Sequence, residues 1–95
     1  MKDLKAAVGR VAVSKAGRDK NRCFLICEIV DDEFVLVVDG ALRKLSRPKK
    51  KKLKHLRLKP YVAEDLGQRM TAGLHVLDSD IRTVLAGFCS EKTSD

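Results

Sequence analysis

The sequence predicts a mainly β protein, a small five-stranded barrel followed by two short C-terminal α-helices. Apolar runs separated by turn residues continue to about residue 58, which is typical of the short strands of a small barrel. After Pro60 the apolar spacing changes from two residues to three or four, which indicates helices. With 95 residues, 44% of them hydrophobic and 35% charged, the chain can build one small core. We therefore expect residues 1–60 to form the barrel and residues 61–95 to form a helical extension packed on it.

The first two strands are expected at 9–14 and 23–30. Val11 and Val13 alternate with the other residues of 9–14, and the cluster at 16–21 is typical of a turn. Residues 23–30 are apolar at almost every position, so this strand should be covered on both faces for most of its length. Alternation places Cys23, Leu25, Cys27 and Ile29 on one face and Phe24, Ile26 and Glu28 on the other.

Three further strands complete the expected barrel. They are expected at 34–38, 41–45 and 53–58. An acidic turn at 31–33 precedes the first of them, and Asp39-Gly40 is a tight-turn signal before the second. The lysine-rich segment 46–52 should be a loop. Because all the connections are small, five such strands suggest a closed or nearly closed barrel.

Two helices are expected after Pro60. The first should run from about 62 to 72 and end at Gly73, because its apolar residues are four apart: Val62, Leu66, Met70 and Leu74. The second should begin at Asp78-Ser79, which can cap it, and its apolar face holds Ile81, Val84, Leu85 and Phe88. These faces should pack on Phe24 and Ile26 of the second strand.

Glycines weaken both expected helices, and the chain should fray at its end. Gly67 and Gly87 lie inside the helical segments, where each costs about 1 kcal/mol relative to alanine. Residues from about Ser90 onward should not hold a fixed conformation. Tertiary packing therefore has to stabilise the helices.

Positive charge is concentrated in one segment. The chain has 20 Lys and Arg against 13 Asp and Glu, a net charge of +7, and residues 43–59 hold ten of the basic residues and no acid. The rest of the chain therefore carries a charge of −3. Such a concentration of one sign is unfavourable unless a polyanion offsets it, and in a cytosolic chain that polyanion is most often nucleic acid. Because Trp is absent and aromatic residues are scarce, binding should be mainly electrostatic.

The composition of the basic segment also fits two roles that involve no RNA. The segment could be a solubilising loop, or a nuclear-import signal in a eukaryotic source. A membrane-surface role is disfavoured, because the leucines of 43–59 form no sustained helical stripe.

The sequence predicts a cytoplasmic protein in a reducing compartment. No window approaches the roughly 20 apolar residues of a membrane span, and the first ten residues lack the apolar stretch of a secretory signal. Cys23, Cys27 and Cys89 lie in apolar runs and are odd in number, so we expect reduced, buried thiols. On a strand, Cys23 and Cys27 would be about 13 Å apart, too far to bind one metal. We expect no metal and no cofactor, with His55 on the strand surface and His75 in a loop.

No residue pattern indicates catalysis. The chain lacks a glycine-rich phosphate loop, a nucleophile elbow and a pair of histidines at helical spacing. The acidic residues 31–33 fit a solvated hairpin turn, and Asp78 and Asp80 fit the start of a helix. We therefore expect a protein that is not an enzyme.

Residues 8–22, continuing through 23–31 to the Val-Asp-Gly of 38–40, resemble a KOW motif. More narrowly, they resemble the KOW domain of the archaeal and eukaryotic large-subunit ribosomal protein L fourteen-e and its small bacterial relatives, over about residues 8–58. The resemblance implies an SH3-like barrel whose loops contact ribosomal RNA and sometimes protein. Asn21 stands where the family usually has glycine, and Asn also tolerates a left-handed backbone. The two helical segments are not part of the minimal KOW barrel.

The leading interpretation is a protein, monomeric when free, that binds structured RNA, in particular ribosomal RNA, in association with the ribosome or translation. Its Lys and Arg side chains would neutralise phosphates, and the first loop would extend this surface if the barrel brings it near 46–52. The alternative is a protein-interaction adaptor that uses the surface of the small barrel. The candidate RNA-binding residues are Lys15, Arg18, Lys20, Arg22, Arg43, Lys44, Arg47, Lys49, Lys50, Lys51, Lys52, Lys54, His55 and Arg57.

Overall fold

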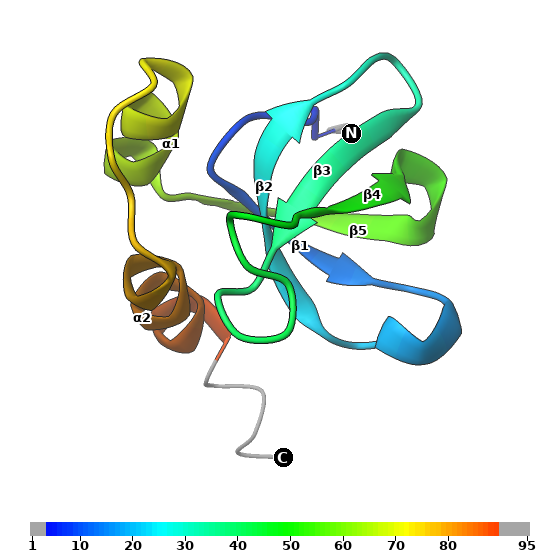
Figure 1. Cartoon of the computed structure of the whole chain (residues 1–95). Coiled ribbons are helices and arrows are strands. Elements are labelled where there is room, and N and C mark those ends of the chain that lie inside the picture. The colour runs from blue at the N-terminus through cyan, green and yellow to red at the C-terminus, as the bar shows by residue number, and fades with distance from the viewer. Residues whose placement is uncertain (1–3, 90–95) are drawn as a thin grey trace.

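A computed structural model describes residues 4–89 as one five-stranded antiparallel sheet with two α-helices (Figure 1). The strands are β1 (Arg10–Ser14), β2 (Cys23–Ile29), β3 (Phe34–Val38), β4 (Lys49–Lys52) and β5 (Leu56–Val62). The helices are α1 (Glu64–Thr71) and α2 (Asp78–Cys89). The mainly β composition and the two C-terminal helices are therefore confirmed. The expected fraying from Ser90 onward lies outside the described residues.

The sheet has the strand order β4-β3-β2-β1-β5 and is not closed. The four neighbouring pairs are antiparallel, and β4 and β5 form the two edges. Both helices lie on one side of the sheet, whereas the connection between β4 and β5 lies at the opposite side of the view (Figure 1). The sequence correctly predicted the number of strands, and the closure of the barrel is not observed.

The fourth strand was expected at the wrong place. Residues 41–45 form bends and turns, because the Asp39 carboxylate accepts hydrogen bonds from the backbone N–H groups of Ala41 and Arg43, both at 2.8 Å. The strand is formed by Lys49–Lys52, which lies in the segment expected to be a loop. β3 supplies a ladder of partners for this segment, so strand pairing overrides the weak strand preference of lysine.

The fifth strand begins later than expected and continues further. Residues Leu53–His55 form a 3-10 turn, and β5 then runs from Leu56 to Val62, across the expected boundary at residue 60. Pro60 is tolerated because β5 is an edge strand. The register with β1 shifts between Arg10 and Ala12, which marks an irregularity beside Pro60.

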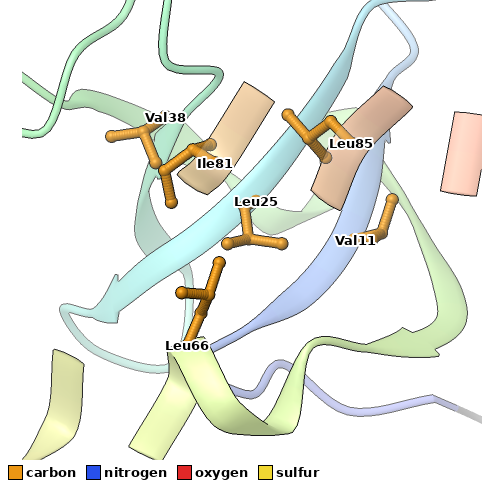
Figure 2. Close-up of a cluster of buried hydrophobic side chains, with 6 residues drawn as sticks. All are labelled: Val11, Leu25, Val38, Leu66, Ile81 and Leu85. Atoms are coloured by element: carbon orange, nitrogen blue, oxygen red, sulfur yellow. The ribbon is translucent and has the colours of Figure 1, made fainter. Parts of the chain in front are cut away.

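Two apolar clusters lie on the two faces of the sheet. The inner cluster, around which the sheet curls, contains Ala12, Phe24, Ile26, Val35, Val37 and Leu56. The helix-covered cluster joins the other face to both helices and contains Val11, Leu25, Val38, Leu66, Ile81 and Leu85 (Figure 2). The helices therefore pack on Leu25 and not, as expected, on Phe24 and Ile26. Alternation along β2 places Leu25 on one face and Phe24 and Ile26 on the other, but it does not decide which face the helices cover.

Gly67 allows α1 to dock closely on the chain before β1. A Cβ atom on Gly67 would lie 2.5 Å from the Val8 carbonyl oxygen and 3.4 Å from the Gly9 Cα. Gly9 in turn accepts a hydrogen bond from the Ala63 N–H at 2.8 Å. The glycine that weakens the helix by propensity is thus required by its tertiary contact.

The expectation of three reduced thiols is wrong for two of them. Cys23, at the start of β2, and Cys89, at the end of α2, form a disulfide with their Cα atoms 6.8 Å apart. The two residues are 66 positions apart, so only the packing of α2 on β2 brings them together. Cys27 is a half-buried free thiol. Neither helix within residues 4–89 is long and apolar enough to cross a membrane.

Candidate nucleic-acid interface

The loop after β1 presents four basic side chains to solvent. A 3-10 turn at Gly17–Asp19 folds the loop back, and Asn21 has a positive φ of 71°. The Asn21 N–H donates to the Ser14 carbonyl at 2.7 Å, so the left-handed residue closes the loop onto β1. The left-handed backbone expected to be tolerated at Asn21 is therefore observed. The four exposed basic residues of the loop are Lys15, Arg18, Lys20 and Arg22.

The four lysines of β4 divide between the two faces of the sheet. Lys49 and Lys51 pair with Val37 and Val35, which belong to the inner cluster, so these two lysines lie on the concave side. The Lys51 ammonium lies 3.5 Å from the Asp19 carboxylate and donates to the Ser14 hydroxyl at 3.2 Å. Only 11% of the Lys51 side chain is exposed. Lys51 therefore helps to cover the end of the inner cluster and offers little surface to a phosphate.

Asp19 joins the first loop to β4. Its carboxylate lies 3.4 Å from the Lys49 ammonium and 3.5 Å from that of Lys51. Burial acts to raise the pKa of Asp19, but the hydrogen bonds and charges of Lys49 and Lys51 outweigh it and hold this pKa below its ordinary value of 3.8. The carboxylate is therefore ionised at neutral pH and fixes the two lysines. Asp19 was missed by the sequence reasoning, although it is the only acid in residues 15–22.

Lys50 and Lys52 lie on the opposite, convex face with Phe34. The Lys50 ammonium is 4.6 Å from the centre of the Phe34 ring, and that of Lys52 is 5.8 Å away. Both distances fit cation–π contacts. Lys50 is exposed and Lys52 is half-buried, so both can still reach a ligand.

The 3-10 turn and the start of β5 continue the same surface. The Lys15 N–H donates to the His55 carbonyl at 2.8 Å, which places the first loop beside the turn. Lys54, His55 and Arg57 are exposed. We call residues 15–22 and 49–57 the basic end of the molecule. It contains ten Lys and Arg and one acid, a net charge of +9, and the rest of the chain carries −2.

Three predicted residues lie elsewhere. Arg43, Lys44 and Arg47 belong to the connection between β3 and β4, which packs against α2 (Figure 1). The Leu45 N–H donates to the Asp78 carboxylate at 2.8 Å. A salt bridge of 3.5 Å between Arg22 and Asp39 links this connection to the first loop.

An acidic turn borders the basic end. The Asp31 carboxylate accepts hydrogen bonds from the N–H groups of Glu33 and Phe34, which lower its pKa below the ordinary value of 3.8. A hollow of about 350 Å³ lies beside the turn and is lined by Asp32, Glu33, Lys52, Leu53 and Lys54. The positive surface is therefore limited on this side.

Metal-binding and nucleophilic chemistry is sparse within residues 4–89. No group of three or more His, Cys, Asp or Glu side chains there is placed to hold a metal ion. Burial, together with the charge of Glu28, raises the pKa of the Cys27 thiol to about 11. This thiol donates to the Leu36 carbonyl at 3.4 Å and stays protonated at neutral pH, so it is a poor nucleophile. No family model matches the chain.

Proposed function

We propose that this protein binds structured RNA, in particular ribosomal RNA, through its basic end and without catalysis. In this proposal the curled sheet is an SH3-like barrel of the KOW type, and the protein acts in the cytoplasm, as a monomer when free, in association with the ribosome or translation. The observation that carries the proposal is the charge separation between the basic end and the rest of the chain.

The basic end combines residues that the sequence separates by more than 25 positions. Asp19 and the backbone contact between Lys15 and His55 bring the first loop, β4 and the start of β5 together. Such a surface suits phosphate neutralisation with release of counterions, which needs many cations and no base-specific geometry. The guanidinium groups of Arg18, Arg22 and Arg57 can make forked contacts to phosphate oxygens.

Lysines on an edge strand can also serve to prevent aggregation. β4 is an edge of the sheet, and lysines there oppose pairing with the edge of another molecule. This accounts for Lys49–Lys52, but it does not account for the four exposed cations of the first loop, which is not a strand. RNA binding accounts for both.

The test compares two variants that lose equal charge. Lys20→Gln with Lys54→Gln removes two exposed cations from the basic end, whereas Lys5→Gln with Arg69→Gln removes two cations outside it. Among residues 4–89, Arg69 forms a salt bridge with exposed Asp65 alone, so its loss should cost little stability. In a titration with an RNA hairpin, the plot of log affinity against log salt should flatten by up to about 0.7 to 0.9 per contact in the first variant.

The control variant should keep a slope close to that of the parent, because it leaves every charge of the basic end in place. Equal slopes in the parent and both variants would contradict the proposal. If RNA does not bind, and one protein partner is captured with little dependence on salt, the adaptor interpretation takes its place.

A further inference from the structure

Tyr61 is the aromatic side chain that the molecule leaves most accessible. The chain has four aromatic residues. Phe24 is fully buried in the inner cluster, Phe34 carries Lys50 and Lys52 over its ring, and Phe88 packs against the helix-covered cluster. Tyr61 is 39% exposed although its ring is already stacked on Phe88, with centroids 5.1 Å apart and planes 10° apart.

Tyr61 and Arg57 lie on the same face of β5. Arg57 pairs with Val13, and Leu58, the next residue, packs on the inner cluster, so Arg57 points away from that cluster. Tyr61 stacks on Phe88, which packs on the helix-covered cluster of the same outer face. Arg57 and Tyr61 are four positions apart along the strand, so their Cα atoms are at most about 13 Å apart. The ring is thus within a few nucleotides of the basic end.

The end of α2 holds Phe88, and with it the Tyr61–Phe88 stack, in place. Phe88 precedes Cys89, which is bonded to Cys23, and Cys23 pairs with Val13, the same residue that pairs with Arg57. The packing of α2 on the sheet therefore holds the end of α2 beside β5, and the disulfide adds a covalent link when it is oxidised. Because Phe88 already orders the Tyr61 ring, stacking of a ligand on the exposed part of the ring costs little side-chain entropy of Tyr61.

We propose that Tyr61 is a stacking platform for an unpaired base of the bound RNA. The inference rests on the proposed function and narrows its ligand to RNA with at least one unpaired nucleotide beside the phosphates that the basic end holds. A base inside a duplex is already stacked on its neighbours, whereas a looped, bulged or single-stranded base has an open face. Stacking on an aromatic ring tolerates any base, so it adds affinity without a sequence preference.

The chain offers a direct probe of this contact. It contains one tyrosine and no tryptophan, so tyrosine emission reports on Tyr61 alone. The full chain is titrated with a single-stranded oligouridylate, with an abasic strand of the same length and with a fully paired RNA duplex. Anisotropy of a labelled strand measures binding, and N-acetyltyrosinamide corrects the emission for absorption by RNA. Oligouridylate should quench most of the tyrosine emission, and the abasic strand and the duplex should bind with little quenching.

Variants of Tyr61 distinguish the contribution of its ring to binding from that of its hydroxyl group and from a loss of folding. Tyr61→Leu should weaken oligouridylate binding about tenfold, equivalent to about 1.4 kcal/mol, and leave binding of the abasic strand unchanged. Tyr61→Phe keeps a ring and should retain the affinity of the parent. Because stacking involves no phosphate, the dependence of affinity on salt should be the same in Tyr61→Leu and in the parent.

The outcomes distinguish this inference from the function on which it rests. Binding of oligouridylate without quenching, equal quenching by the abasic strand, or parental affinity of a folded Tyr61→Leu variant would each overturn the platform and leave RNA binding intact. Failure of all three ligands to bind would overturn the proposed function and the platform together. Thermal melts of the two variants verify that each is folded, and the quenching of the unmodified chain needs no variant.

Discussion

On the helix-covered face, Leu25 and Ile81 are fully buried among apolar side chains, whereas at the basic end Lys49 and Lys51 are held by one carboxylate. Apolar burial stabilises by about 25 cal/mol per Å². The attraction between Asp19 and its two lysines is offset in part by the desolvation of these partly buried charges. The fold is therefore held mainly where the helices meet the sheet, and the charged end can carry a binding surface at small cost. Changes in the two regions should therefore separate stability from the proposed RNA binding.

The largest effect is expected from truncation of the helix-covered cluster. Ile81→Ala removes a fully buried side chain that packs on the sheet, and it should lower the free energy of unfolding by about 2–5 kcal/mol. Urea denaturation measures this loss. Thr83→Ala, at an exposed position of the same helix, should change stability by about 0.5 kcal/mol or less. A loss from Ile81→Ala no larger than that of Thr83→Ala would show that α2 does not stabilise the sheet.

The next effect concerns the covalent link between the two regions. Cys89→Ser should lower stability by about 2–4 kcal/mol in oxidised protein, because the disulfide closes a long loop in the unfolded chain. Under a reductant, the parent and the variant should have nearly equal stability.

Thiol counting tests the same link independently. The oxidised parent should expose one reactive thiol on unfolding, that of Cys27, and three after reduction. In the folded protein Cys27 should react more slowly than in the unfolded chain, since burial raises its pKa to about 11. Three reactive thiols without any reductant would contradict the disulfide.

A smaller effect distinguishes two glycines of the helices. Gly67→Ala should destabilise the protein by about 1–3 kcal/mol, because its Cβ would lie 2.5 Å from the Val8 carbonyl oxygen. A Cβ atom on Gly87 would meet no atom of residues 4–89 within 4 Å outside its own stretch of helix, so Gly87→Ala should stabilise α2 by up to about 1 kcal/mol through helix propensity. Thermal unfolding of the two variants checks the opposite signs. Stabilisation by both would show that α1 does not dock closely on Gly9.

The smallest effect is expected at the basic end. The pKa of Asp19 is lowered in the folded protein, so its stabilising effect is present above 3.8 and is lost as the pH falls through the lower folded value. Asp19→Asn should cost about 1 kcal/mol or less at pH 7, and the difference from the parent should vanish in acid. Urea midpoints across this pH range measure the effect. High salt should reduce it, and a difference that persisted in acid would contradict a stabilising ion pair.

The sequence by itself determined the elements whose local signals agree with their packing. The alternation of Val11 and Val13, the apolar run of β2 and the four-residue spacing after Pro60 predicted β1, β2, β3 and both helices near their observed positions. The concentration of charge likewise predicted the chemistry of the basic end, since net charge is a property of composition.

Only the tertiary structure decided which residues meet. Lysine has little preference for strands, so the sequence did not predict β4, which forms because it pairs with β3. Residues 41–45 form a loop because the Asp39 carboxylate accepts hydrogen bonds from their backbone. Alternation on β2 separates two faces but does not say which face is concave, so the helices were assigned to the wrong one. The Cys23–Cys89 disulfide and the Tyr61–Phe88 stack join residues far apart in the chain, and such contacts depend on how the helices dock, which local sequence does not encode.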